Sequence, residues 1–111
     1  MILRSDGYIL TNFHVIQRAS KISVKLADEQ IYIAEPVAGN PILDIAIIRI
    51  HPKQPLQAIE LAADNDLLLG ETVIALGNPF GLEQSVTVGV LSARNREARY
   101  NGEVLYRDIL Q

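Results

Sequence analysis

Short runs of apolar residues, separated by turn-forming residues, recur along the chain. Ile22, Val24 and Leu26 alternate with polar neighbours, which predicts a strand with one buried face. A longer run at 31–39 predicts a second strand, and Pro36 marks a bulge or an edge there because proline cannot donate to a sheet ladder. Short strands bounded by turns are typical of barrels and sandwiches. The pattern therefore predicts an all-β fold.

The remaining apolar runs extend this prediction toward both ends of the chain. Asp6 and Gly7 stand between two apolar runs and predict a hairpin turn. Residues 43–50 are apolar on both faces, which predicts a strand inside the fold. Further strands are expected within 71–81, 85–93 and 103–110, and the single helical expectation is a turn at about 14–19.

A change in composition marks the middle of the chain. Residues 51–70 predict a loose connection because they hold two prolines and two aspartates: Pro52, Pro55, Asp64 and Asp66. A chain of 111 residues has room for one ordinary domain, or for one domain and part of another. We therefore expect a boundary near 64–70 and divide the chain into domains 1–66 and 67–111.

Charge and cysteine content argue against several classes of protein. The net charge of -3 disfavours a nucleic-acid surface, which needs a concentrated excess of Lys and Arg. Four arginines near the end alternate with acidic residues and are interpreted as a solvated loop face: Arg94, Arg96, Arg99 and Arg107. The absence of cysteine excludes disulfides, thiolate metal sites and a Cys nucleophile. No apolar window is long enough for a membrane-spanning helix, and the first residues lack the pattern of a signal peptide.

His14 and Asp44 stand out chemically. Asp44 lies in an apolar run, where a buried carboxylate needs a partner to offset its loss of hydration. An imidazole that donates to a carboxylate keeps its other nitrogen free as a general base, which makes His14 the natural partner. Alternatively, Asp44 caps the turn after Pro41 through a local backbone bond, and His14 is a packed structural residue. Ligand spacing disfavours a metal site built from His14, His51 and the carboxylates, so we expect no metal and no cofactor.

Three segments, in this order, resemble the HtrA/DegP family of trypsin-like serine proteases: DGYILTNFHVI, LDIAIIRI and LGETVIALGNPFGLEQSVTVGVLSA. The resemblance implies a chymotrypsin/trypsin-like double β-barrel. Residues 1–66 would form most of the first barrel, incomplete at its N-terminus, and 67–111 the first part of the second. The resemblance also implies that His14 is the catalytic base and Asp44 the triad acid. The GNPFG segment is expected to shape a turn beside the active site.

The third catalytic residue of this family is a serine in a Gly-Asn-Ser-Gly-Gly segment, which the 111 residues do not contain. The five serines present do not stand between glycines and are interpreted as ordinary turn or strand residues: Ser5, Ser20, Ser23, Ser85 and Ser92. We therefore expect a fragment of a serine endopeptidase, truncated before its nucleophile and inactive as this chain because the oxyanion-hole donors are missing too. The alternative is a non-catalytic β-barrel interaction module.

The resemblance also implies partners and a location. Unfolded or misfolded polypeptides are the expected substrates of the full-length protein, and the bacterial periplasm or cell envelope is its expected compartment. A second barrel that is only partly present leaves unpaired strand edges, and exposed edges with apolar side chains pair readily with another chain. We therefore expect a homo-oligomer or a strand-swapped assembly through open sheet edges.

Overall fold

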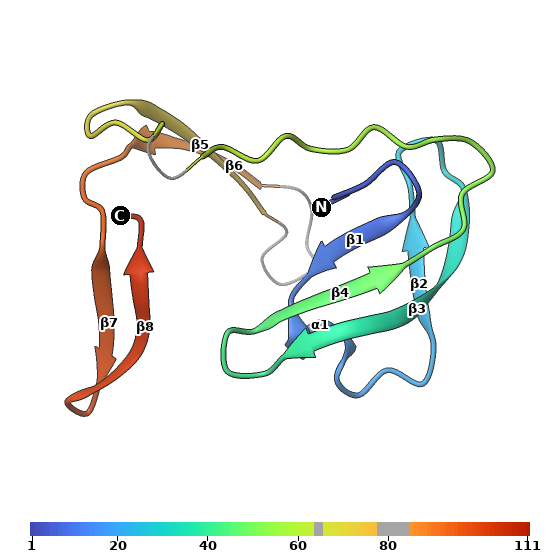
Figure 1. Cartoon of the computed structure of the whole chain (residues 1–111), viewed down its shortest axis with the longest axis horizontal. Helices are drawn as coiled ribbons and strands as arrows, with labels where there is room; N and C mark the ends of the chain where they lie inside the picture. Colours follow the sequence, from blue (N-terminus) through green and yellow to red (C-terminus); the bar gives the residue numbers. More distant parts are fainter. Residues whose placement is uncertain (64–65, 78–84) are drawn as a thin grey trace. The chain divides into compact units, whose positions relative to one another are not determined.

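The computed structural model describes residues 1–63, 66–77 and 85–111 and divides into two compact units, Met1–Leu61 and Ala62–Gln111 (Figure 1). The regular elements among the described residues are strands, apart from one helix of four residues. The all-β prediction is confirmed. The division between the units falls within the 51–70 connection.

The first unit is a four-stranded antiparallel sheet with the strand order β1-β4-β3-β2 (Figure 1). Its strands are β1 (Tyr8–Thr11), β2 (Ile22–Lys25), β3 (Ile31–Asn40) and β4 (Ile45–Arg49). The predicted irregularity at Pro36 is present, because the register between β3 and β4 shifts between Pro36 and Ala38. Helix α1 (Phe13–Ile16) follows β1 after Asn12 and overlaps the helical turn predicted at about 14–19.

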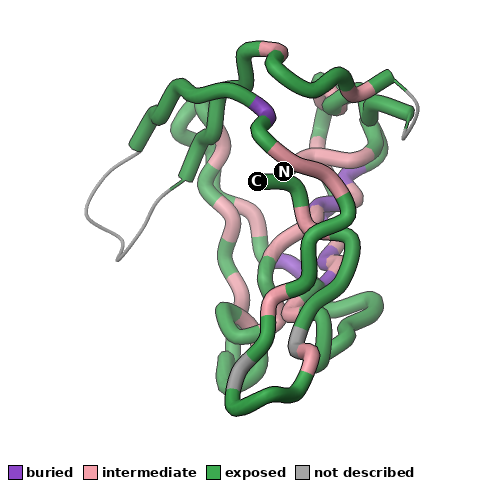
Figure 2. Tube along the Cα trace, turned by 90° about the vertical axis from the view of Figure 1, so that its left-hand side faces the viewer, coloured by how far each residue is buried: buried purple, intermediate pink, exposed green. Residues whose placement is uncertain are grey.

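The core of this unit lies on one face of the sheet. Ile9, Ala34, Ile48 and Ile50 form a buried cluster, against which half-buried aliphatic side chains pack. Buried positions are few among the described residues, as Figure 2 shows in purple. Residues 43–50 were expected to be enclosed on both faces, and this is correct for one face only: Ile45, on the other face, is 43% exposed.

The Asp6-Gly7 turn brings two stretches of backbone into close contact. Gly7 has φ +102, a region that favours glycine, and its carbonyl oxygen accepts the N–H of Ile50 at 3.0 Å. A Cβ at this position would collide with the carbonyl oxygen of Ile50. The turn therefore contacts the backbone just after β4, at the end where β1 begins to pair with β4.

The second unit contains two separate two-stranded ribbons, β5 (Thr72–Gly77) with β6 (Ser85–Val90) and β7 (Arg96–Tyr100) with β8 (Glu103–Ile109). The interpretation of the arginine-rich region as a loop was wrong for Arg96, Arg99 and Arg107, which lie in β7 and β8; Arg94 precedes β7. Charged side chains of both signs belong to these strands, and Glu97 pairs with both Arg99 and Arg107. Apart from Gly77, the GNPFG segment lies outside the described residues.

Candidate functional site

The first half of the candidate site is a sharp change of direction at Asn12. Strand β1 ends at Thr11, and Asn12 keeps an extended conformation, φ -82 and ψ 144, before α1 begins at Phe13. This is the backbone of a helix N-cap. His14 therefore sits in the first turn of α1, and its side chain is 63% exposed.

The second half of the site is the turn at 41–44 that connects β3 to β4. Asn40 shapes this turn, because its side-chain oxygen accepts the N–H groups of Ile42 at 2.9 Å and Leu43 at 3.1 Å. The capping role considered for Asp44 thus belongs to Asn40. Asp44 has φ +52, in the left-handed region, and stands just before β4 rather than inside an apolar strand. Its side chain is 31% exposed, so the expectation of a deeply buried carboxylate was wrong.

His14 and Asp44 meet through two separate hydrogen bonds. The backbone N–H of His14 donates to Asp44 Oδ1 at 2.8 Å, and the ring Nδ1 lies 2.6 Å from Asp44 Oδ2. Each carboxylate oxygen is therefore engaged by a different part of the same residue. Within the part of the chain that the structure describes, Nε2 of His14 has no hydrogen-bond partner.

These contacts control the charge of Asp44. The backbone N–H of His14 is the largest cause of a lowered Asp44 pKa, followed by the hydrogen bond from the His14 ring. Partial burial acts in the opposite direction, and the charge of His14 and a bond from Asn12 make smaller contributions that lower the pKa. Asp44 is therefore ionised near neutral pH and acts only as an acceptor.

Asn12 also belongs to this site, although the sequence did not predict it. Its amide nitrogen Nδ2 lies 3.1 Å from the carbonyl oxygen of Asp44 and 3.2 Å from Asp44 Oδ2. Asparagine at the start of a helix is normally interpreted as an N-cap, so the sequence carries no signal that its side chain reaches another segment.

The chemistry available at this site is proton transfer. A carboxylate that accepts from Nδ1 fixes the tautomer and orientation of the imidazole, and leaves Nε2 as a base that faces solvent. No serine hydroxyl among the described residues forms a hydrogen bond with the His14 ring. Among the described residues, the structure thus brings an imidazole and a carboxylate together and places no serine hydroxyl beside them.

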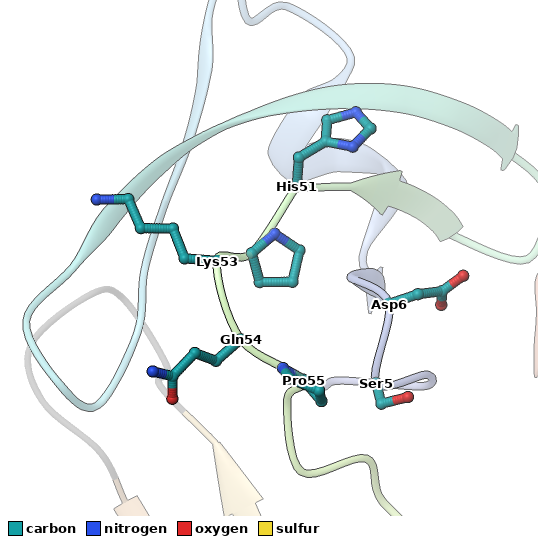
Figure 3. A pocket seen from close by; sticks show the side chains of 7 residues that line it. Ser5, Asp6, His51, Lys53, Gln54 and Pro55 are labelled. Carbon is teal, nitrogen blue, oxygen red and sulfur yellow. The ribbon is translucent and has the colours of Figure 1, made fainter.

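Residues of the first unit line open hollows, of which one lies away from the candidate site and one beside it. A cleft of about 320 Å³ is lined by Ser5, Asp6 and residues 51–55, and it includes neither His14 nor Asp44 (Figure 3). A smaller hollow of about 200 Å³ is lined mainly by apolar groups of residues 38–40 and 45–47, which flank the turn that holds Asp44. The described residues contain no cluster of His and acidic side chains able to hold a metal ion. Nor does their single short helix have the length to cross a membrane.

Comparison with known proteins decides the family. A protein-family model, described as a trypsin-like peptidase domain, matches residues 1–109. The chain belongs to the trypsin-like peptidase family. The HtrA-type protease AlgW, solved with a decapeptide, matches 100% of this chain with a TM-score of 0.81 and 37% identity. The resemblance to HtrA/DegP proteases and the chymotrypsin-like fold are therefore confirmed.

Curated relatives support the same assignment. A probable periplasmic serine endoprotease, DegP-like, from Chlamydia trachomatis is 44% identical over 95 residues, which cover 86% of this chain and 19% of the relative. Protease Do-like 1, chloroplastic, from Arabidopsis thaliana is 45% identical over 93 residues, which cover 83% of this chain and 21% of the relative. The chain thus spans about a fifth of these relatives and 33% of the AlgW chain.

Proposed function

We propose that His14 and Asp44 are the general base and the orienting acid of an HtrA-type serine endopeptidase. Its full-length form would cleave unfolded or misfolded polypeptides by acyl transfer. The observation that supports this proposal best is the 2.6 Å contact between His14 Nδ1 and Asp44 Oδ2, together with the exposed Nε2. The same observation weighs against the view that His14 is a packed structural residue.

In the proposed mechanism, Nε2 of His14 takes the proton of a serine hydroxyl as its oxygen attacks the scissile carbonyl. The ring then carries a positive charge, which the ionised Asp44 carboxylate stabilises across the Nδ1 contact. The imidazolium returns the proton to the leaving amine when the peptide bond breaks. Asp44 keeps its negative charge throughout these steps.

We propose that the 111-residue chain does not hydrolyse peptide bonds on its own by this mechanism. None of its five serines forms a hydrogen bond with His14, and the chain contains no Gly-Asn-Ser-Gly-Gly segment. The backbone N–H groups that would stabilise the oxyanion belong to that segment in the family. Loss of one such donor already costs about 10²–10³ in kcat.

A second candidate function is a non-catalytic interaction module. The β5–β6 ribbon favours it, because five large aliphatic side chains share one face and are all more than half exposed: Ile74, Leu76, Val86, Val88 and Val90. Two-stranded ribbons are marginal alone in water. This face and the open edges of the ribbon would support self-association or strand exchange between copies.

A chimera tests the catalytic proposal. Residues 1–111 would replace the matching third of AlgW, whose remaining residues would then supply a nucleophile. We expect the chimera to hydrolyse an unfolded polypeptide, Asp44→Asn to reduce kcat by orders of magnitude, and the isolated chain to be inactive.

Two results would contradict these proposals. Full activity of the Asp44→Asn chimera would show that Asp44 does not orient the base. Hydrolysis by the isolated chain that is lost in its own His14→Ala variant would refute the proposed inactivity.

A further inference from the structure

Asn12 occupies the N-cap position of α1 and does not cap it. An N-cap asparagine normally accepts a hydrogen bond from a backbone N–H in the first turn of its own helix. Asn12 makes no such bond. The N–H of His14, which an N-cap side chain would otherwise satisfy, donates instead to Asp44 Oδ1. The carboxylate of Asp44 therefore caps the helix, and the side chain of Asn12 is left for another role.

The side chain of Asn12 binds two atoms of Asp44. Its nitrogen Nδ2 lies 3.1 Å from the backbone oxygen of Asp44 and 3.2 Å from Oδ2, so its two N–H groups can bind both. Both partners are pure acceptors, which identifies the amide nitrogen as the atom that faces them. Phe13 adds a third contact, because its N–H donates to the same Asp44 carbonyl at 3.2 Å.

The double contact matters because Asp44 has a conformation that needs support. Its φ of +52 lies in the left-handed region, which costs a non-glycine residue energy and persists only where neighbouring groups impose it. The side chain is also partly open to water, which competes for its oxygens. Asn12 binds the backbone and the carboxylate together, and it binds the same oxygen that faces His14 Nδ1.

We propose that Asn12 is a positioning residue, which locks the carboxylate of Asp44 in the orientation that receives the His14 ring. The inference rests on the proposed function of the His14 and Asp44 pair. The side-chain hydrogen bonds of Asn12 go to Asp44 and not to the His14 ring, so Asn12 acts through Asp44. The bond from Asn12 also contributes to the lowered pKa of Asp44, after the larger contributions of His14.

Substitutions at Asn12 separate positioning from capping. Asn12→Asp and Asn12→Ser keep good N-cap residues, whereas both remove the amide donor. Asn12→Asp also keeps the shape of the side chain and places a second carboxylate beside Asp44, which raises the pKa of Asp44. Asn101→Asp, in the turn between β7 and β8, adds the same charge in the second unit and is the matched control.

The measurement is NMR of the 111-residue chain, with the His14 Nδ1 proton and the carboxyl carbon of Asp44 as probes. We expect a protected Nδ1 proton in the parent protein and in Asn101→Asp. In Asn12→Asp and Asn12→Ser we expect its solvent exchange to rise about tenfold or more, as loss of a hydrogen bond to a charged group implies. The methyl signals of Ile9 and Ile48 report whether each variant keeps its core.

The outcomes separate this inference from the proposed function. An unchanged Nδ1 exchange rate and an unchanged Asp44 pKa in Asn12→Asp would overturn the positioning role of Asn12 and leave the pair intact. An Nδ1 proton that exchanges equally fast in the parent and in Asp44→Asn would overturn the pair itself, and the inference with it. Loss of the Ile9 and Ile48 signals in both Asn12→Asp and Asn12→Ser would show that Asn12 supports the fold as a whole, which also contradicts the proposal.

Discussion

Asp44 binds His14 through both of its carboxylate oxygens. The backbone N–H of His14 donates to Oδ1, and the ring nitrogen Nδ1 forms a hydrogen bond with Oδ2. The two residues are 30 positions apart and meet because β1 and β4 pair in a fixed register. Thr11, the last residue of β1, lies opposite Ala46 near the start of β4. Asn12 to His14 therefore fall beside Asp44, and any change that shifts this register moves the His14 ring away from the Asp44 carboxylate.

The paired Asp44 makes stability depend on pH in acid. Its pKa in the folded chain is below the ordinary value of 3.8, so the unfolded chain binds more protons in acid and stability rises with pH there. The stabilisation is complete above 3.8 and is lost as the pH falls through the lower folded value. We expect the parent protein to exceed Asp44→Asn in unfolding free energy near neutral pH and to lose this advantage in acid, as urea denaturation would measure. A difference that does not vary with pH would contradict the contact.

Gly39 keeps space for the aromatic ring next to His14. A Cβ on Gly39 would lie 2.7 Å from Cδ2 and 2.8 Å from Cε2 of Phe13. We expect Gly39→Ala to displace α1 and to lower the free energy of unfolding by about 1–3 kcal/mol. Gly89→Ala is the control, because nothing lies within 4 Å of its added Cβ. Denaturation followed by circular dichroism compares the two, and equal effects would show that the ring has room to move.

Gly7 is constrained by both its backbone angle and its contact with Ile50. Gly7→Ala forces a side chain into φ +102 and onto the Ile50 carbonyl, so we expect a loss of about 3 kcal/mol or more. Gly70→Ala shares the positive φ, +88, without any neighbour within 4 Å, and should cost about 1–2 kcal/mol. The Ile48 methyl NMR signal, followed during urea denaturation, measures the free energy of unfolding of Gly7→Ala. A Gly7→Ala protein as stable as the parent would contradict the close approach of Gly7 to the Ile50 carbonyl oxygen.

The apolar face of the β5–β6 ribbon predicts concentration-dependent association. Val88 is 68% exposed on this face, and Thr87 projects from the opposite one. We expect light scattering to show a smaller mass for Val88→Lys than for the parent protein at high concentration, since a lysine opposes burial of this face. Thr87→Lys adds the same charge on the other face and should associate as the parent does. A parent protein that stays monomeric would refute the association.

Much of the first unit could be predicted from local patterns. Alternation identified β2, and Pro36 marked the bulge in β3, because both effects depend on a few neighbouring residues. The strand β7 was missed, since its charged side chains hide the period of two that its pairing with β8 creates. Local composition carries little information about a strand whose main support is its partner.

At the candidate site, too, local sequence carries little information about features that depend on distant partners. The chemistry of His14 and Asp44 made their pairing a reasonable expectation, but the left-handed turn at Asp44 and its partial exposure could not be predicted from an apolar run. The role of Asn12 was also out of reach. It is a short polar side chain whose usual local bond competes with a longer-range one, and only the tertiary structure decides between them. Asn40, in contrast, makes the local turn bonds that are usual for asparagine.

The most direct test of the central claim compares the two histidines of the chain in the AlgW chimera. His51 also belongs to the first unit and also lies near a carboxylate, with its Nε2 4.0 Å from Glu35 Oε2. His51→Ala is therefore a matched control for His14→Ala. If His14 is the general base, kcat/KM for an unfolded polypeptide falls by about 10⁴ or more in His14→Ala and is nearly unchanged in His51→Ala. Equal activity of the two variants would contradict the assignment of His14 as the base.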